Sequence, residues 1–268
     1  MRALLAQLEP AAGDPEANIA TLESALAAHA GVQLAVFPEL FLCGYELEQA
    51  QQLAIAVEDE LMRRAQRAAA ERSTALILGF AERTPAGTVA NSAACVDADG
   101  TLAGVYRKTH LFAEGERRAF EQGEELLLVR LAGRRVAPLI CFDVEFPEPA
   151  RALCNEGAEL LVTIAANMAP YGPDHALATR ARALENRRAH LYVNRVGARH
   201  GLRFVGESTA IDPTGAVTAA AGDGEQLMEV DVPETSAPTA EVDYLQYARG
   251  ELPVREADPH SGARGETT

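Results

Sequence analysis

A cysteine, a glutamate and a lysine each stand at the end of an apolar run that predicts a β-strand. They are Cys141, Glu39 and Lys108. Acidic residues and a proline closely follow the cysteine. Such neighbours are unfavourable in a core and favour an exposed nucleophile. A thiol is a weak nucleophile until a base removes its proton, and the thiolate needs a positive charge nearby. Glu39 could supply the base and Lys108 the charge.

Attack of a thiolate on a carbonyl group also creates an oxyanion that must be stabilised. The ammonium group of Lys108 and the backbone N–H of Phe142 could donate hydrogen bonds to it. Each residue taken singly has a simpler interpretation, because a cysteine ending an apolar strand is usually a small core residue. A glutamate after a proline usually lies in a solvated turn, and a lysine before Thr-His usually lies on the surface. The residues alone leave both interpretations open.

Length and composition favour one large α/β domain. The chain has 268 residues, of which 48% are apolar, so a sizeable core is available. We expect a single domain over residues 1–250, followed by a tail over residues 251–268 that is flexible or is ordered by a partner. Lys and Arg total 24 against 39 for Asp and Glu, a net charge of −15, which disfavours nucleic acid and anionic membranes as partners.

The N-terminus and the cysteines bear on cellular location. Residues 1–8 predict a short strand rather than a signal peptide, and no apolar run approaches the roughly 20 residues that span a bilayer. Cys43, Cys95, Cys141 and Cys154 are far apart, without metal-ligand spacing, so neither a metal site nor a disulfide framework is expected. We therefore expect a soluble, cytoplasmic protein.

Apolar runs alternate with amphipathic helical segments, which is typical of layered α/β architecture. Hairpins among the βαβ units favour a mixed sheet or two stacked sheets over one parallel sheet. Helices are predicted at residues 14–30, 49–72, 147–157 and 175–188. Strands are predicted at residues 1–8, 32–37, 75–80, 91–97, 101–107, 125–131, 134–141, 160–165, 191–196, 209–212, 216–218 and 226–230. We predict that the helix at 175–188 has a solvated or subunit-facing surface that carries Arg180, Arg182, Arg187 and Arg188.

Three motifs in order together resemble the nitrilase, or carbon–nitrogen hydrolase, superfamily over about residues 1–232. They are Phe37-Pro38-Glu39, Tyr106-Arg107-Lys108-Thr109-His110-Leu111-Phe112 and Cys141-Phe142-Asp143-Val144-Glu145-Phe146-Pro147-Glu148. The resemblance implies a Glu39-Lys108-Cys141 triad and an α/β fold, a four-layer αββα sandwich of two mixed sheets flanked by helices. It also implies a thioester intermediate, no cofactor, and a homodimer or higher homo-oligomer. Relatives carry a further active-site glutamate eight residues after the lysine, here Glu116, with Glu114 close enough to leave that assignment open.

Within the superfamily the sequence looks most like 5-aminopentanamidase and the R-stereoselective amidases. The similarity rests on the cysteine motif and on residues 163–171, and the Cys-Trp-Glu of nitrile-cleaving members is missing. It implies hydrolysis of a small aliphatic carboxamide, with or without an amino substituent, to the acid and ammonia. The alternatives are a nitrilase, an N-carbamoyl-amine amidohydrolase, and an inactive member that serves as a binding module.

One position bears on substrate choice. Relatives that act on carboxylate-bearing substrates often have arginine four residues after the cysteine, where this sequence has Glu145. A carboxylate there would repel an acidic substrate and attract a cationic amine, so we hypothesise that Glu145 selects amino-amides. The alternative is that Glu145 only supports the loop or Lys108. Asn167 and Tyr171 are predicted to line the same pocket, although asparagine is also an ordinary turn residue.

Overall fold

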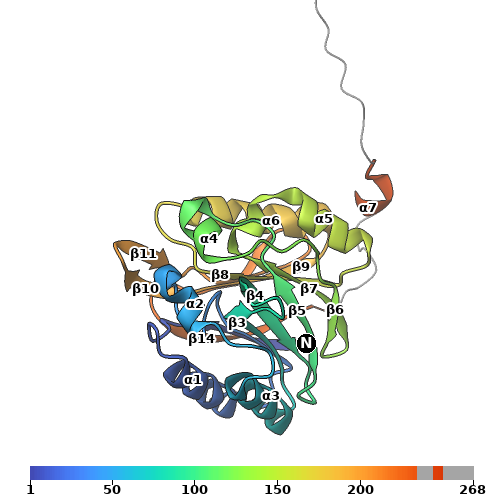
Figure 1. Cartoon of the computed structure of the whole chain (residues 1–268). Helices are drawn as coiled ribbons and strands as arrows, with labels where there is room; N and C mark the ends of the chain where they lie inside the picture. Colours follow the sequence, from blue (N-terminus) through green and yellow to red (C-terminus); the bar gives the residue numbers. More distant parts are fainter. Residues whose placement is uncertain (234–243, 250–268) are drawn as a thin grey trace, which may run out of the picture.

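Two six-stranded mixed sheets lie at the centre of the computed structural model, which describes residues 1–233 and 244–249 (Figure 1). The first sheet, in the order β14-β1-β2-β3-β4-β5, contains β1 (Arg2–Gln7), β2 (Leu34–Val36), β3 (Ala75–Arg83), β4 (Val89–Val96), β5 (Leu102–Arg107) and β14 (Gln226–Asp231). The second sheet, in the order β13-β12-β9-β8-β7-β6, contains β6 (Val129–Leu131), β7 (Arg134–Ile140), β8 (Leu160–Ala165), β9 (Ala189–Asn194), β12 (Thr209–Ile211) and β13 (Val217–Ala220). The predicted tail at 251–268 lies outside the described residues.

Each sheet has a parallel centre with antiparallel strands on both sides. Strands β1, β2 and β3 are parallel in the first sheet, as are β7, β8 and β9 in the second. Strand β5 also runs in the direction of β3, because both are antiparallel to β4. Parallel strands end at the same edge of a sheet, so the segments that follow β2 and β5 lie at one edge. The segments that follow β7 and β8 likewise share an edge of the second sheet.

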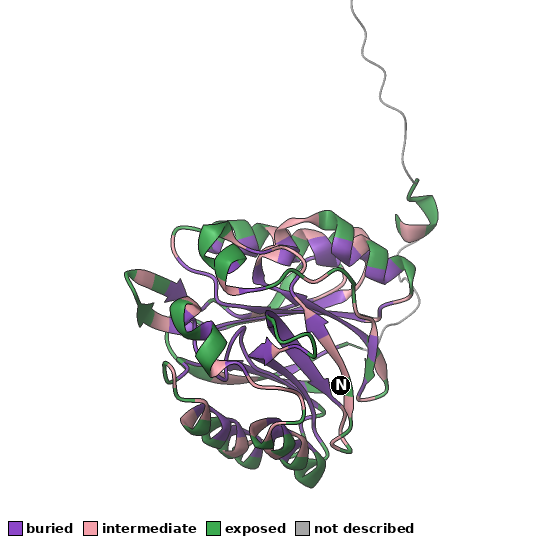
Figure 2. Cartoon of the chain, viewed as in Figure 1, coloured by how far each residue is buried: buried purple, intermediate pink, exposed green. Residues whose placement is uncertain are grey.

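Apolar side chains fill the space between the two sheets. Leu5, Val36 and Ile77 of the first sheet belong to the same buried cluster as Val136 and Ile164 of the second. Figure 2 shows this centre as buried strands, with exposed residues concentrated on the outward faces of the helices. The two sheets therefore pack face to face and share one core.

Helices cover the outer face of each sheet. Helices α1 (Pro15–Ala28) and α3 (Glu60–Arg72) cover the first sheet, and α5 (Pro147–Asn155) and α6 (Gly172–Asn186) cover the second (Figure 1). Ile19 and Met62 face the first sheet in one buried cluster, and Leu153 faces the second in another. The arrangement is a helix–sheet–sheet–helix sandwich, which confirms the predicted fold class.

The predicted helix at 49–72 was wrong in its extent. The structure has a 3₁₀ turn (Leu47–Gln49), a short α2 (Ala50–Leu53) and then the separate α3. Between them the chain is extended, and the backbone of Ile55 pairs with that of β3 through hydrogen bonds to Ala81 and Arg83. The side chain of Asp59 then caps α3 by accepting a hydrogen bond from the backbone N–H of Leu61, which fixes a new helix start.

Two strand predictions also differ from the structure. The strand expected at 125–131 is only β6, and a hairpin of β10 (Val196–Arg199) and β11 (Leu202–Val205) was not predicted. The hairpin turns at His200 and Gly201, which have φ values of 51° and 79°. Two consecutive residues with positive φ form the kind of turn that suits a two-residue hairpin. Among residues 1–233 and 244–249, no helix combines the length and apolarity required to cross a bilayer.

Gly79 of β3 lies against the backbone that carries Glu39. A Cβ atom at Gly79 would lie 2.2 Å from the carbonyl oxygen of Pro38 and 2.6 Å from the backbone nitrogen of Leu40. We expect Gly79→Ala to push this segment away and to lower the free energy of unfolding by about 1–3 kcal/mol, measured by urea denaturation. Gly222→Ala is the control, since a Cβ there meets no atom within 4 Å. Equal unfolding free energies for the two variants would contradict this role for Gly79.

Candidate active site

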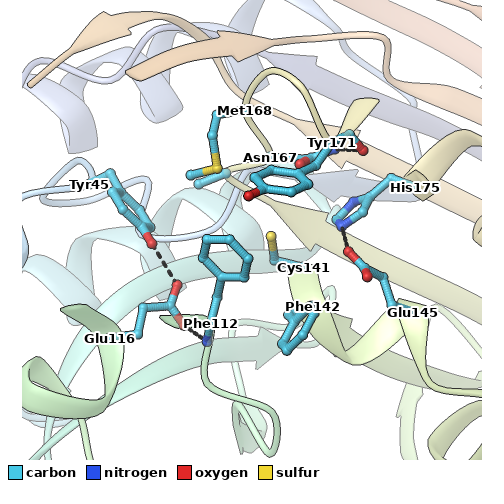
Figure 3. Close-up of a pocket in the computed structure, with 11 residues that line it drawn as sticks. Tyr45, Phe112, Glu116, Cys141, Phe142, Glu145, Asn167, Met168, Tyr171 and His175 are labelled. Carbon is cyan, nitrogen blue, oxygen red and sulfur yellow. Dashed lines mark hydrogen bonds and ion pairs between the residues drawn. The ribbon is translucent and has the colours of Figure 1, made fainter. Parts of the chain in front are cut away.

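The end of the first sheet brings Glu39 and Lys108 into direct contact with each other and with Glu116. Lys108 Nζ donates hydrogen bonds to Glu39 Oε1 at 2.7 Å and to Glu116 Oε1 and Oε2 at 2.9 and 2.8 Å. The three side chains are 0%, 0% and 1% exposed. Cys141 lines the same pocket as Glu116 and points its sulfur into that pocket (Figure 3). The side chains named from the three sequence motifs therefore share one site.

Both oxygens of Glu39 are fixed by donors from the two sheets. Oε1 accepts a second hydrogen bond from the side chain of Asn91 in β4, at 2.7 Å. Oε2 accepts one from the backbone N–H of Ala166, directly after β8, also at 2.7 Å. Glu39 follows a strand of the first sheet and Ala166 follows one of the second, so this carboxylate bridges the edges of both sheets.

Glu116 lies on the inner face of α4 (Ala113–Ala119). Its Oε1 accepts from Tyr45 Oη at 2.8 Å, and its Oε2 accepts from the backbone N–H of Phe112 at 2.8 Å. Glu114 is placed on the opposite face, exposed and paired with Arg118 at 3.0 Å. Residues two apart on a helix point in nearly opposite directions, so only Glu116 of the two reaches Lys108. Of the two glutamates that the sequence left open, Glu116 therefore contacts Lys108, and the alternative of Glu114 was wrong.

Burial and charge set the protonation states at the centre. Burial disfavours the charged form of Lys108, but the carboxylates of Glu116 and Glu39 outweigh it and hold the pKa of Lys108 well above its usual range. Burial and the Glu39 carboxylate raise the pKa of the Cys141 thiol well above its usual range, against the opposing effect of Lys108. The sulfur therefore keeps its proton at neutral pH, and its activation requires a base.

Cys141 begins the 3₁₀ helix η2 (Cys141–Glu145) in a left-handed conformation, with φ 48°. Such a backbone is costly for a residue with a side chain and persists only where its surroundings hold it. Asp143 supplies one of these constraints, because its buried carboxylate accepts hydrogen bonds from four donors at 2.8–3.0 Å. The donors are the backbone N–H groups of Ile140 and His110 and the hydroxyls of Tyr106 and Thr109. Asp143 therefore ties the cysteine turn to the segment around Lys108.

Arg182 supplies a second constraint on the cysteine turn. Its guanidinium donates to the carbonyl oxygens of Val144 and Glu145 at 3.1 and 3.2 Å and pairs with Glu185 at 2.7 Å. The side chain is only 9% exposed, so the prediction of a solvated or subunit-facing position was wrong for this arginine. Its place on α6 next to the turn is a consequence of packing that the helical pattern did not reveal.

The pocket around Cys141 is small, and its lining combines aromatic with polar side chains. The cavity volume that the centre of a water molecule can occupy is about 10 Å³. This volume is roughly enough for one water molecule. Phe142, Glu145, Asn167 and Tyr171, four residues that the sequence motifs singled out, all line it. Further lining residues that the sequence analysis did not assign to the site are Tyr45, Phe112, Met168 and His175. Phe112 stands in the lysine motif and could have been found there, whereas no local pattern marks Tyr45 or His175.

Glu145 contacts a histidine rather than the lysine. Its Oε1 lies 3.2 Å from Nε2 of His175, and its side chain is 29% exposed. The carboxylate partners of Lys108 are Glu39 and Glu116, so support of Lys108 by Glu145 was the wrong alternative. Across residues 1–233 and 244–249, no group of three or more His, Cys, Asp or Glu side chains is arranged to hold a metal ion.

The raised pKa of Cys141 predicts how alkylation depends on pH. We expect the rate for Cys141 with iodoacetamide to rise about threefold between about pH 9 and about pH 9.5, whereas the rate of an ordinary thiol with a pKa of about 8.5 rises only about 1.2-fold over that interval. Mass spectrometry of the modified peptide measures this rate, and Cys141→Ala shows the background from the other buried cysteines. A plateau below about pH 8.5 would mean that the thiolate is already formed in the resting protein.

Comparisons with known proteins agree with this geometry. The carbon-nitrogen hydrolase family model matches residues 2–241. An (R)-stereoselective amidase from Pseudomonas sp. is 39% identical over 269 residues, covering 98% of this chain and 97% of the relative. Omega-amidase YafV from Escherichia coli is 31% identical over 221 residues, covering 81% and 83%.

Solved structures of an amidase from Nesterenkonia sp. AN1 resemble this fold. One is a mutant that shows covalent addition of the acetamide moiety of fluoroacetamide at the active-site cysteine, with 30% identity, a TM-score of 0.83, and coverage of 93% of this chain and 94% of that one. Another mutant of the same amidase, in complex with butyramide, gives the same identity, TM-score and coverage. This chain therefore belongs to the carbon–nitrogen hydrolase family of the nitrilase superfamily and is an enzyme that acts on carbon–nitrogen bonds.

Proposed function

We propose that the protein hydrolyses a small aliphatic carboxamide to the carboxylic acid and ammonia through a thioester on Cys141. The observation that carries this proposal is the buried Lys108 held between Glu39 and Glu116 at 2.7–2.9 Å, beside a protonated thiol. The apolar lining of Phe112, Phe142 and Met168 supports an aliphatic acyl group. The amidase relatives, and the butyramide complex of the Nesterenkonia enzyme, support an amide as the substrate.

The first half of the reaction forms the thioester. Glu39 takes the proton from the Cys141 thiol as the sulfur bonds to the carbonyl carbon and the C=O electron pair moves to oxygen. Lys108 and the backbone N–H of Phe142 donate hydrogen bonds to that oxyanion. Loss of one such donor typically lowers the rate by about 100- to 1000-fold. The tetrahedral intermediate collapses with cleavage of the C–N bond, and Glu39 returns the proton to the departing nitrogen, which leaves as ammonia.

The second half of the reaction releases the acid. A water molecule occupies the place of the departed ammonia, and Glu39 takes its proton as the water oxygen bonds to the thioester carbon. The C–S bond then breaks, the acid leaves, and the proton returns to the sulfur. Glu116 contacts Lys108 through both carboxylate oxygens and lines the pocket, so it orients the ammonium group during both halves.

We further propose that the substrate carries an amine at the end opposite the amide. Glu145 lines the pocket as a carboxylate, and its charge favours a cationic amine over an acidic group. Arg182 donates its hydrogen bonds to the backbone carbonyls of the turn and to Glu185 rather than to this carboxylate. The described part of the chain therefore gives Glu145 no arginine or lysine partner that would cancel its charge.

A cytoplasmic location and a homodimer complete the proposal. All four cysteines are free thiols, which suits a reducing compartment. Exposed apolar side chains on α6 and β13 support a contact with a second copy of the chain, because isolated proteins seldom expose such groups together. These are Leu177, Leu184 and Val217, exposed by 71%, 40% and 44%.

A substrate panel tests the activity. We expect ammonia release from butyramide, pentanamide and 5-aminopentanamide, highest for the last in kcat/KM, and a loss of at least about 1000-fold in Cys141→Ala. Acid formed from a nitrile without amide hydrolysis would favour a nitrilase, and carbon dioxide released with ammonia would favour an N-carbamoyl-amine amidohydrolase. Undiminished turnover by Cys141→Ala would refute the assigned nucleophile, and inactivity of the wild type on the whole panel would favour a binding module.

The mass in solution tests the dimer. We expect sedimentation equilibrium at micromolar concentration to give twice the mass of one chain, and Leu177→Glu to shift the population toward the monomer because it places a charge in the apolar contact. Leu126→Glu is the matched control, since Leu126 is also exposed, by 37%, but precedes β6 on another part of the fold. A wild-type protein with the mass of a single chain would rule out this assembly.

A further inference from the structure

We propose that Tyr192 and His175 are positioning residues that hold Glu145 as a fixed carboxylate facing the substrate, so that they determine the preference for an amine-bearing amide. This inference rests on the proposed binding of the amine by Glu145. Neither residue belongs to the three sequence motifs, and neither contacts Glu39, Lys108 or Glu116 in the described hydrogen bonds. Their role would therefore be in substrate selection rather than in the chemistry at the sulfur.

The three side chains form a chain of contacts across three elements. Tyr192 of β9 lies with its hydroxyl 3.0 Å from Nδ1 of His175, in the first turn of α6. Nε2 of His175 lies 3.2 Å from Oε1 of Glu145, at the end of η2. Figure 3 shows the imidazole and the carboxylate side by side at the pocket wall. His175 and Tyr192 are 2% and 4% exposed, so the packing of strand and helix sets their positions.

The contacts also bear on the hydrogen positions. Burial raises the pKa of Tyr192 well above its usual range, so the phenol keeps its proton. The phenol hydroxyl can donate this hydrogen to Nδ1 of His175, 3.0 Å away. An imidazole that accepts at Nδ1 carries its hydrogen on Nε2, which faces Oε1 of Glu145.

The contact with His175 restricts the orientation of the Glu145 carboxylate. Within residues 1–233 and 244–249, Oε1 of Glu145 lies 3.2 Å from Nε2 of His175, whereas Oε2 has no hydrogen-bond partner. A carboxylate with one oxygen held and the other free can present that free oxygen to an ammonium group in a single orientation. Preorganisation of this kind raises affinity because less conformational freedom is lost on binding. The geometry therefore assigns the free oxygen of Glu145 to the amine of the substrate.

The experiment compares two amides that differ only in the amine, 5-aminopentanamide and pentanamide. The measured quantity is the ratio of their kcat/KM values, in which any general loss of activity cancels. We expect His175→Leu to lower the ratio about tenfold, mainly through a higher KM for 5-aminopentanamide, because Glu145 loses the polar contact at 3.2 Å that fixes its orientation. Tyr192→Phe should lower the ratio less, and His175→Gln, which keeps a donor near the position of Nε2, should restore most of it.

Two further variants make the outcome decisive. His200→Leu is the matched control, because it removes a histidine that pairs with Glu46 at 2.8 Å outside this pocket, and it should leave the ratio unchanged. Glu145→Gln should lower the ratio at least as much as His175→Leu. If Glu145→Gln lowers the ratio and His175→Leu does not, the positioning role is refuted while amine binding by Glu145 stands. If neither changes the ratio, or the wild type shows no preference, both are refuted, whereas amide hydrolysis by Cys141 stands on its own test.

Discussion

The buried ammonium group of Lys108 is the interaction on which the rest of the site depends. Two carboxylates, Glu39 and Glu116, lie close to it with almost no exposure to water. Without a cation between them, both would be buried charges with a strong tendency to take up protons. With the cation in place, each carboxylate has a partner and a defined orientation. The same arrangement keeps the neighbouring thiol protonated until a substrate arrives, because the negative charge of Glu39 and burial act together on Cys141.

The scaffold supplies this arrangement through the direction of its strands. Glu39 and Lys108 follow strands of the first sheet, whereas Cys141 and Ala166 follow strands of the second. Asp143 connects the two sets, because it accepts hydrogen bonds from Tyr106 of β5 and from the backbone of Ile140 in β7. The outer helices contribute the remaining parts: α4 carries Glu116, and α6 carries His175 and Arg182. Both sheets and the helices α4 and α6 therefore contribute to the site.

Sequence reasoning located the parts that are encoded locally. An apolar run followed by a reactive residue predicts a strand end, and three such ends in family order indicated Glu39, Lys108 and Cys141 and the two-sheet fold. The choice between Glu114 and Glu116 depends on which residues of α4 face the site. This helix has seven residues and is too short to show a periodic pattern in the sequence. The break in the predicted helix at 49–72 depends on pairing between Ile55 and β3, a contact between distant segments. Tyr45, His175 and Arg182 gain their places by tertiary packing, so nothing beside them in the sequence marks them.

The division of the reacting groups between two sheets has a consequence for how this molecule tolerates change. Glu39 and Lys108 belong to one sheet of the sandwich and Cys141 to the other, and the sheets meet through a closely packed layer of small and branched side chains. Such layers resist compression and transmit displacements rather than absorbing them. A shift of one sheet relative to the other by a fraction of an ångström would misalign Cys141 and Glu39 while leaving every strand intact. Enzyme activity is therefore a more sensitive measure of the packing between the two sheets than a measurement of whether the chain is folded.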